Sequence, residues 1–359
     1  MRRILAQFLL VRFAGIFLFV LFTLTSLLVL FDLLAHADDL AVNHRETLLP
    51  MACYACLRLP VLLAMITPMC ALLAALVTFE RLASQYELVA LQGAGVSMYQ
   101  VCLILLLGGI AVAVLHFGLA VNVVPPAEAR LFRWAERNYQ GLPGRAVLEP
   151  GPAWFAAGAF QTHISNARDD GRLLDTVLLI ERDEPGSIMA YYEAREARYD
   201  GSGWTLMNGW KQSITDGQRQ GFARLPLALP LDPEQVTQVR LPVSSLDFAA
   251  LRALSAKPAG SAAFPSWHYK AWIGRRLAEP LGSLVMILLA APLGLQLKRS
   301  GRQLQWGSIA LGLGFLFFII ERLLLAFGES GALAPSLAVW GPLAVFGLVG
   351  IILLSMLQK

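Results

Sequence analysis

The chain has 359 residues, of which 57% are hydrophobic and only 15% charged, and its formal net charge is +4. With a mean hydropathy of +0.59, this composition excludes an ordinary soluble protein, because a soluble chain of this length carries more charge. Several apolar runs reach the length of about 20 residues that a bilayer requires, so the sequence predicts a polytopic membrane protein.

The first third of the chain contains three apolar runs, expected as membrane spans over about Phe13–Leu34, Leu59–Phe79 and Val101–Val124. The run after Met1-Arg2-Arg3 is much longer than the apolar core of a signal peptide and has no small-residue cleavage site behind it. We therefore expect it to stay in place as the first span. Pro125-Pro126 is expected to end the third span, because proline disrupts a helix interior.

Four cysteines are present, and Cys53 and Cys56 form a C-x-x-C. In an oxidising compartment such a pair forms a disulfide or takes part in redox exchange. This pair leaves open an alternative function, that of a membrane thiol-disulfide oxidoreductase. Cys70 and Cys102 sit inside apolar runs and offer no second exposed pair to relay electrons, and a packed cysteine is the commoner case.

The stretch Phe79–Ser97 joins the second and third spans and has the pattern of a short amphipathic helix of about residues 80–95. Its apolar positions recur at helical spacing: Leu82, Tyr86 and Val89. Its polar positions lie on the opposite side: Glu80, Ser84 and Glu87. Gly93 and Gly95 are expected to end the helix. Such a helix either docks a soluble partner or is a solvated connection.

From Ala127 to Pro265 no run is long enough to span a membrane, and charged residues return. Strand-like runs alternate with turn-forming residues over Trp154–His163, Leu173–Glu181, Ser187–Ala194, Trp204–Met207 and Trp210–Ile214. Short strands at this spacing predict an antiparallel sandwich or jelly roll. We therefore expect a helical part over 1–126, an inserted antiparallel β (jelly-roll-like) domain over 127–265 and a second helical part over 266–359.

Three more apolar runs bring the expected number of spans to six: Ala278–Leu297, Gly307–Phe327 and Leu337–Leu357. Glu321 and Arg322 lie inside the fifth. An ionisable group in hydrocarbon costs at least about 2.5 kcal/mol, so it normally faces a cavity or a partner. Adjacent residues point in different directions on a helix, which leaves two interpretations: one of them lines a substrate surface, or Arg322 extends to the outer interface.

Basic residues in short loops predict the orientation of the spans. One side carries Arg2, Arg3, Arg81, Lys298, Arg299, Arg302 and Lys359. In the short loops, the other side carries Arg45 and Arg58. The first side is therefore expected to be cytoplasmic, with both termini and the 80–95 helix, and the β domain is expected outside.

Motifs of catalysis and metal binding are absent from the sequence. There is no G-x-x-x-x-G-K-[ST] phosphate loop, no H-E-x-x-H and no G-x-S-x-G. The five histidines are scattered, without metal-ligand spacing. Any ATP-driven work is thus expected to need another subunit, and no cofactor is expected.

Three segments carry a resemblance to a known family. They are E-L-V-A-L-Q-G-A-G-V-S from Glu87, the hairpin-like Ala194–Trp210, and the loop before the sixth span with Pro335 and Trp340. Together with the plan of three spans, a large domain and three spans, they resemble the LptF/LptG permeases. The resemblance implies a permease subunit of the ABC transporter that extracts lipopolysaccharide from the bacterial inner membrane and passes it to a periplasmic bridge.

The resemblance also implies partners: an LptF-like permease in a heterodimer, a dimer of an LptB-like ATPase and an LptC-like protein in the periplasm. The chain itself is then expected to be non-catalytic. In that family the helix between the second and third spans fits a groove in the ATPase, and a glutamate at the position of Glu87 contacts it. The expected ATPase-coupling residues are Glu80, Ser84, Glu87 and Leu91.

The expected lipid contacts depart from the family at one point. Members can carry lysines near the outer end of the first span, whereas the stretch from Leu30 to His36 here has none and contains an added acid, Asp32. Basic residues before the fourth span are therefore predicted to bind lipid phosphates, with interfacial anchoring as the alternative. The full set of lipid-binding candidates is Lys270, Arg275, Arg276, Glu321, Arg322 and His36.

Overall fold

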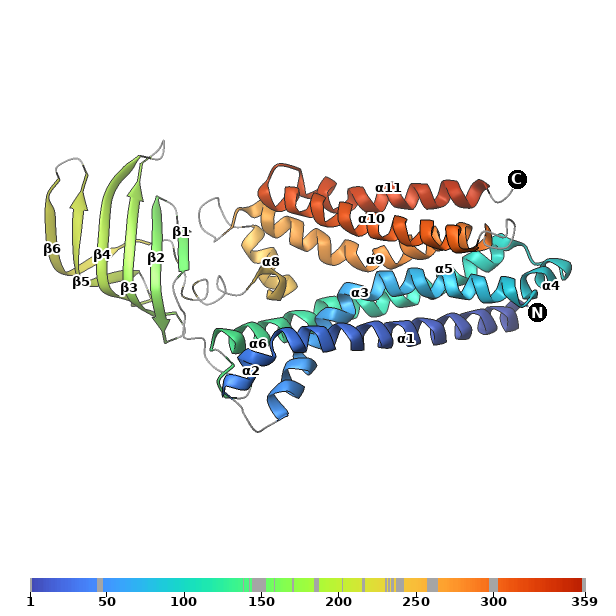
Figure 1. Ribbon diagram of the computed structural model, residues 1–359. Coiled ribbons are helices and arrows are strands. Elements are labelled where there is room, and N and C mark those ends of the chain that lie inside the picture. Colours follow the sequence, from blue (N-terminus) through green and yellow to red (C-terminus); the bar gives the residue numbers. More distant parts are fainter. Residues whose placement is uncertain are drawn as a thin grey trace.

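The computed structural model describes residues 2–43, 48–137, 139–141, 143, 153–157, 159–169, 171–183, 187–201, 203–214, 217–229, 231, 233, 236, 242–256, 264–296 and 303–356. Long helices run side by side, and a curved sheet stands at one end of them (Figure 1). The short helix α4 (Glu87–Gly93) lies at the opposite end, close to both chain termini (Figure 1).

Within the described residues, six helical segments are long and apolar enough to cross a membrane, which confirms the expected number. The first group is α1 (Arg2–Ala35), α3 (Leu49–Ser84) and α5 (Met98–Gly118) with its extension α6 (Val124–Glu136). The second group is α9 (Ser266–Gln296), α10 (Gln303–Ser330) and α11 (Pro335–Met356). A short helix α2 (Ala37–Asn43) follows α1.

Pro125-Pro126 does not end the third span, contrary to the sequence prediction. A π-helical turn, η1 (Leu119–Val123), leads from α5 directly into α6. Both prolines stand in the first turn of α6, directly after the π-helical turn. Proline is tolerated inside a membrane helix where a local π turn and neighbouring groups satisfy the freed carbonyl groups. The helix therefore continues for another 13 residues toward the sheet.

The helical core forms where α3 and α9 pass through the centre of the bundle. Their facing sides are fully buried, with Ala74, Ala75 and Phe79 on α3 and Met286 and Ala290 on α9. α1, α10 and α11 instead keep exposed apolar side chains along their outer faces, among them Phe19, Phe22, Phe315 and Ile351. Exposed apolar surface of this extent is typical of helices that face lipid or a partner helix.

The strands form one six-stranded antiparallel sheet in sequence order. Their bounds are β1 (Ala153–Ala157), β2 (Phe160–Arg168), β3 (Leu173–Arg182), β4 (Ile188–Tyr199), β5 (Trp204–Ser213) and β6 (Arg219–Leu227). The antiparallel, inserted character of this part is thus confirmed. The described strands lie in one meandering sheet, whereas a jelly roll has two sheets joined by Greek-key connections.

Individual strand predictions were wrong at three places. Trp154–His163 is a hairpin of β1 and β2, and the two runs on either side of Asn208-Gly209 belong to the single strand β5. Asn-Gly is typical of a hairpin turn, but here Asn208 has a φ of 54° within the strand, and the register with β4 and β6 is the same on both sides of it. β6 was missed because it is an edge strand with charged residues and Pro226 in place of clean alternation.

Helical connectors join the sheet to the bundle on both sides. α6 leads into it, and η2 (Val243–Ser245) and α8 (Phe248–Ser255) lead back to α9. Leu251 and Leu254 of α8 pack with Tyr269 of α9 in a small buried cluster. The division of the chain at 127 and 265 stays a proposal, since the strands occupy only 153–227 of that range.

Candidate functional site

α4 is set off from α3 by a single residue with left-handed backbone. α3 ends at Ser84, Tyr86 has a φ of 58°, and α4 begins at Glu87. Leu88 is buried and fixes α4 against the bundle, and Gly95, with a φ of 81°, turns the chain into α5. The result is a compact reversal at the end of the molecule farthest from the sheet (Figure 1).

The apolar stripe predicted for this stretch is wrong. Leu82 is fully buried, but Tyr86 and Val89 are 69% and 53% exposed. The reason is the break at Tyr86, which rotates α4 relative to α3 and ends the continuous helical period. Glu80 and Ser84 are exposed, as the polar pattern predicted. The outward surface of this end therefore carries both apolar and polar side chains.

Glu87 does not simply point outward. Its carboxylate accepts a hydrogen bond from Nη1 of Arg12 on α1, at 2.5 Å, while Nη2 of Arg12 donates to Oε1 of Gln85 at 2.6 Å. The side chains of Arg12 and Glu87 are 17% and 33% exposed. Sequence reasoning missed Arg12, because no local pattern connects residues 75 positions apart.

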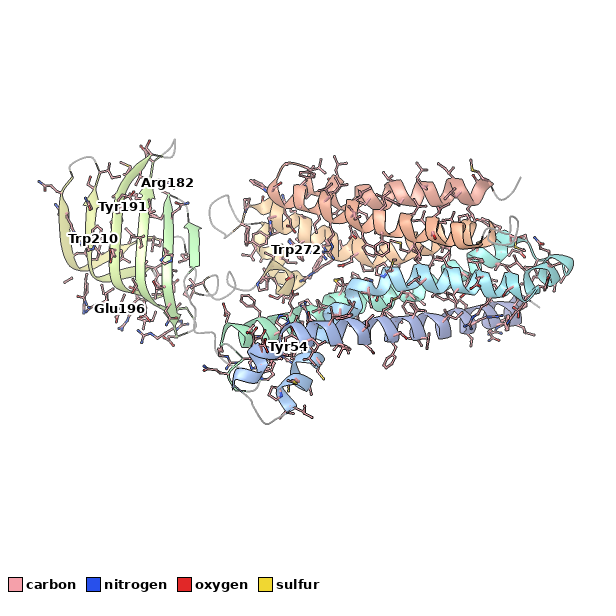
Figure 2. All side chains as sticks on the ribbon, in the orientation of Figure 1. Tyr54, Arg182, Tyr191, Glu196, Trp210 and Trp272 are labelled. Atoms are coloured by element: carbon pink, nitrogen blue, oxygen red, sulfur yellow. The ribbon has the colours of Figure 1, made fainter. Side chains whose placement is uncertain are left out.

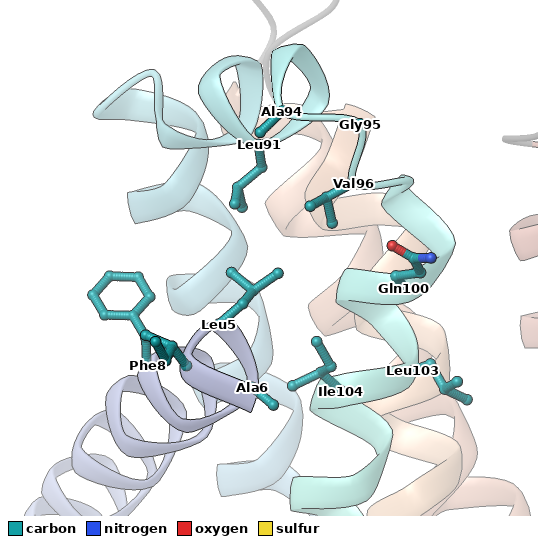
Figure 3. A pocket seen from close by; sticks show the side chains of 11 residues that line it. Leu5, Ala6, Phe8, Leu91, Ala94, Gly95, Val96, Gln100, Leu103 and Ile104 are labelled. Carbon is teal, nitrogen blue, oxygen red and sulfur yellow. The ribbon is translucent and has the colours of Figure 1, made fainter. Parts of the chain in front are cut away.

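An apolar pocket of about 790 Å³ lies between the first turns of α1, the end of α4 and the first turns of α5 (Figure 3). Leu91, predicted as a coupling residue, is half-buried and lines it together with Leu5, Phe8, Val96 and Ile104. Leu91 therefore faces the interior of this end and is not on the outward surface of α4.

A polar cluster joins α1 and α3 at the end nearer the sheet, and we call it the Asp32 cluster. Asp32 accepts hydrogen bonds from Tyr54 at 2.8 Å and from Nε and Nη2 of Arg58 at 3.0 and 3.2 Å. Nδ1 of His36 lies 2.9 Å from the carbonyl oxygen of Asp32 and 3.1 Å from the Tyr54 hydroxyl. His36, a lipid-binding candidate, is therefore engaged within the chain.

Aromatic rings from the α6 end cover the Asp32 cluster. The ring of Tyr139 meets that of Tyr54 edge-on at 6.1 Å and that of Trp134 at 5.2 Å. Burial, and next to it the nearby carboxylate of Asp39, raises the pKa of Tyr139. The cluster thus ties α1, α3 and the end of α6 together.

The three basic candidates on α9 are not brought together as predicted. Lys270 is exposed, whereas Arg276 is only 5% exposed and donates from Nη2 to the carbonyl oxygen of Ser244 at 2.7 Å. The Ser244 hydroxyl in turn donates to Glu128 on α6 at 2.8 Å. Arg276 therefore anchors the η2 connector between α9 and α6.

Arg275 lies in a different environment from Arg276. It pairs with Glu279 one turn later at 3.4 Å, and its guanidinium carbon is 4.8 Å from the centre of the Trp272 ring. Glu321 on α10 is within electrostatic range of Glu279 and Arg275. Arg322 is exposed. The two adjacent residues of α10 thus face different surroundings, and Glu321 is the one directed toward α9.

Several buried nitrogen atoms in this region have no hydrogen-bond partner among the described residues. On α9 they are Nε1 of Trp272, Nε of Arg275 and Nη1 of Arg276. Trp272 lies about one turn before both arginines, whereas Arg275 and Arg276 are adjacent and point in different directions. On α5, both ring nitrogens of His116 are also without a partner, and the residue is 2% exposed. We call these four residues the α9 cluster.

The C-x-x-C lies on one turn of α3, next to the Asp32 cluster. Cys53 is half-buried, Cys56 is exposed and both thiols are free. Within the described residues, no group of three or more His, Cys, Asp or Glu side chains is arranged to hold a metal ion.

Comparison with known proteins gives two findings. A model of the family described as "Lipopolysaccharide export system permease LptF/LptG" matches residues 7–356 of this chain. The lipopolysaccharide export system permease protein LptG of Haemophilus influenzae is 25% identical over 288 residues, which cover 75% of this chain and 77% of that protein.

Proposed function

We infer the function from the premise that this chain belongs to the LptF/LptG family of lipopolysaccharide export permeases, whose model covers nearly all of it. Family membership and the six apolar helices make it a multi-pass protein of the bacterial inner membrane and a permease subunit of lipopolysaccharide export. The match over 7–356 is the observation that carries this conclusion, because it spans both helical groups and the sheet.

We propose further that the chain works as the LptG-type half of an ABC transporter. It pairs with an LptF-like permease, receives work from an LptB-like ATPase dimer, and delivers lipid to an LptC-like protein on the periplasmic side. Two observations support this proposal. The sequence contains no phosphate-binding loop of its own, and α1 and α10 carry exposed apolar faces suited to a second permease.

The proposed orientation puts α4 in the cytoplasm and the sheet in the periplasm. Arg3 and Arg81 belong to the α4 end of the helices, as the excess of basic residues on the cytoplasmic side requires. The end of α3 and α4 together are then the contact with the ATPase, through exposed Glu80 and Ser84 on α3, Tyr86 between the helices and Val89 on α4. A surface that combines large apolar and polar side chains is typical of a protein interface.

The α9 cluster is the best-supported contact with the lipid headgroup. Buried donors without acceptors are uncommon in folded proteins, and those of Trp272 and Arg275, which lie about one turn apart on α9, suit a ligand rich in acceptor oxygens, such as a lipid phosphate. In this proposal Arg275 binds the phosphate with support from Trp272, Lys270 remains an interfacial residue, and Arg276 mainly holds the connector.

Purification of the tagged chain in mild detergent tests the proposed assembly. We expect an LptB-like ATPase and a second permease to copurify, and Val89→Asp to remove the ATPase while the second permease stays bound. Met189→Asp, which places the same charge at an exposed apolar position on β4, at the opposite end of the molecule, is the matched control and is expected to retain both. Recovery of the permease pair with the ATPase still bound to Val89→Asp would refute the role of α4.

A further inference from the structure

Arg12 contacts both residues that flank the break between α3 and α4. Gln85 is the C-cap of α3, Glu87 is the first residue of α4, and the left-handed Tyr86 stands between them. Each terminal nitrogen of Arg12 donates to one of the two, at 2.6 and 2.5 Å. A planar guanidinium with two directed bonds restrains the relative orientation of its acceptors.

The pocket described above lies between the same two elements that the ion pair joins. It separates Leu5 and Phe8 of α1 from Leu91 of α4 and from Val96 in the turn that follows α4 (Figure 3). Across this open pocket the apolar side chains of α1 and of the α4 end do not pack closely, so apolar contact alone leaves this side of α4 loosely attached to α1. Arg12 supplies a polar contact between α1 and the residues at the start of α4.

The partial burial of the pair makes its geometry important. Arg12 is mostly enclosed, and its guanidinium carbon lies 5.7 Å from the centre of the Phe8 ring on its own helix. Hydrogen bonds between charged groups are stronger than neutral ones, and more so where water is partly excluded. A displacement of α4 that keeps this pair intact must therefore move the first turns of α1 with it.

We propose that Arg12 is a positioning residue that couples α4 to α1, so that a displacement of α4 is carried into the first membrane helix. The inference deepens the proposed function, in which α4 receives work from the ATPase, and it assigns to Glu87 a partner within the chain.

The test compares Arg12→Gln, Glu87→Gln and the exchanged pair Arg12→Glu with Glu87→Arg, each in the complete transporter in lipid vesicles. Arg81→Gln is the matched control, because Arg81 is an exposed arginine at the same end of the molecule. ATPase binding, ATP hydrolysis and lipopolysaccharide release are measured side by side.

We expect Arg12→Gln to assemble and hydrolyse ATP but to release lipid about tenfold more slowly per ATP, the loss of one charge-assisted contact of about 1.4 kcal/mol. The exchanged pair should recover most of that release, since it restores the ion pair in reverse. Lipid release by Arg12→Gln equal to that of Arg81→Gln would overturn the inference. So would an exchanged pair as defective as Glu87→Gln, because Glu87 would then act through an outside partner.

A distance measurement separates this inference from the proposed function. Spin labels at the exposed positions Val11 on α1 and Val89 on α4 report their separation in the purified chain, whatever it transports. We expect Arg12→Gln to broaden the distance distribution and Arg81→Gln to leave it unchanged. An unchanged distribution in Arg12→Gln overturns the inference, while failure of the wild-type complex to release lipid overturns only the proposed function.

Discussion

The Asp32 cluster and the α9 cluster both place ionisable side chains among apolar helices at the sheet-side end of the bundle, where Figure 2 labels Tyr54 and Trp272. They differ in how their hydrogen bonds are satisfied. Asp32 accepts three hydrogen bonds, from Tyr54 and Arg58, and His36 lies within reach of two oxygen atoms. In the α9 cluster, Trp272, Arg275, Arg276 and His116 each keep a nitrogen without a described partner.

The difference shows that buried charge is not by itself a sign of a binding site. A cluster whose donors and acceptors satisfy one another is complete and serves to hold helices together. In a cluster with surplus donors, some donors lack an acceptor. A ligand that supplies acceptor oxygens therefore stabilises such a cluster. The sequence ranked His36 with Arg275 as lipid contacts, and the structure separates them on this criterion.

Among the changes in the two clusters, Asp32→Ala is expected to have the largest effect. It leaves Arg58 and Tyr54 without their acceptor and should lower the free energy of unfolding by about 2–4 kcal/mol. Chemical unfolding of the purified chain in detergent measures this. The double variant Asp32→Leu with Arg58→Leu removes both charges and should recover at least half of the loss, and a double variant as unstable as Asp32→Ala would contradict the structural role of the cluster.

Arg275→Lys tests the ligand-binding role of the α9 cluster. Lysine keeps a positive charge beside Glu279 but removes the unpaired Nε donor, so the unfolding free energy should change by less than about 1 kcal/mol. Lipopolysaccharide binding should weaken about tenfold, or about 1.4 kcal/mol. Unfolding of the purified chain without lipopolysaccharide measures the first quantity, and the stabilisation caused by added lipopolysaccharide measures the second. Lys270→Gln is the control, and an equal loss of binding there would favour general charge attraction.

His116→Leu tests the unsatisfied state of the α9 cluster directly. Because neither ring nitrogen has a described partner, the apolar replacement should raise the unfolding free energy of the ligand-free chain by about 1 kcal/mol. Thermal unfolding without lipid is the measurement. A loss of stability of the same size would show that His116 has a partner when the chain is in its membrane.

The smallest effect is expected for Cys53→Ser with Cys56→Ser, next to the Asp32 cluster. Both thiols are free, and neither takes part in the hydrogen bonds of Asp32. The unfolding free energy should therefore change by less than about 0.5 kcal/mol. Lipopolysaccharide export in cells should continue at the wild-type rate, and a loss of export would revive the oxidoreductase alternative, which the family match does not support.

Local patterns in the sequence were sufficient for the plan of the molecule. Uninterrupted apolar runs predicted six membrane helices, glycines after Gln92 predicted the end of α4, and runs between turn-forming residues predicted an antiparallel inserted sheet. These features depend on the hydrophobicity and backbone preferences of neighbouring residues, which a single chain displays directly. The same patterns carried the resemblance to the family, which the match over 7–356 confirmed.

Tertiary structure alone decided which polar residues meet. Arg12 and Glu87 are 75 positions apart, and Arg276 is 32 positions from Ser244, so no helical or strand period relates them. Arg275 and Arg276 look alike in sequence, yet one lies against Trp272 and the other is buried under η2. Hydrophobic burial sets which faces turn inward, but the pairing of individual charges depends on how whole helices are rotated and placed against one another.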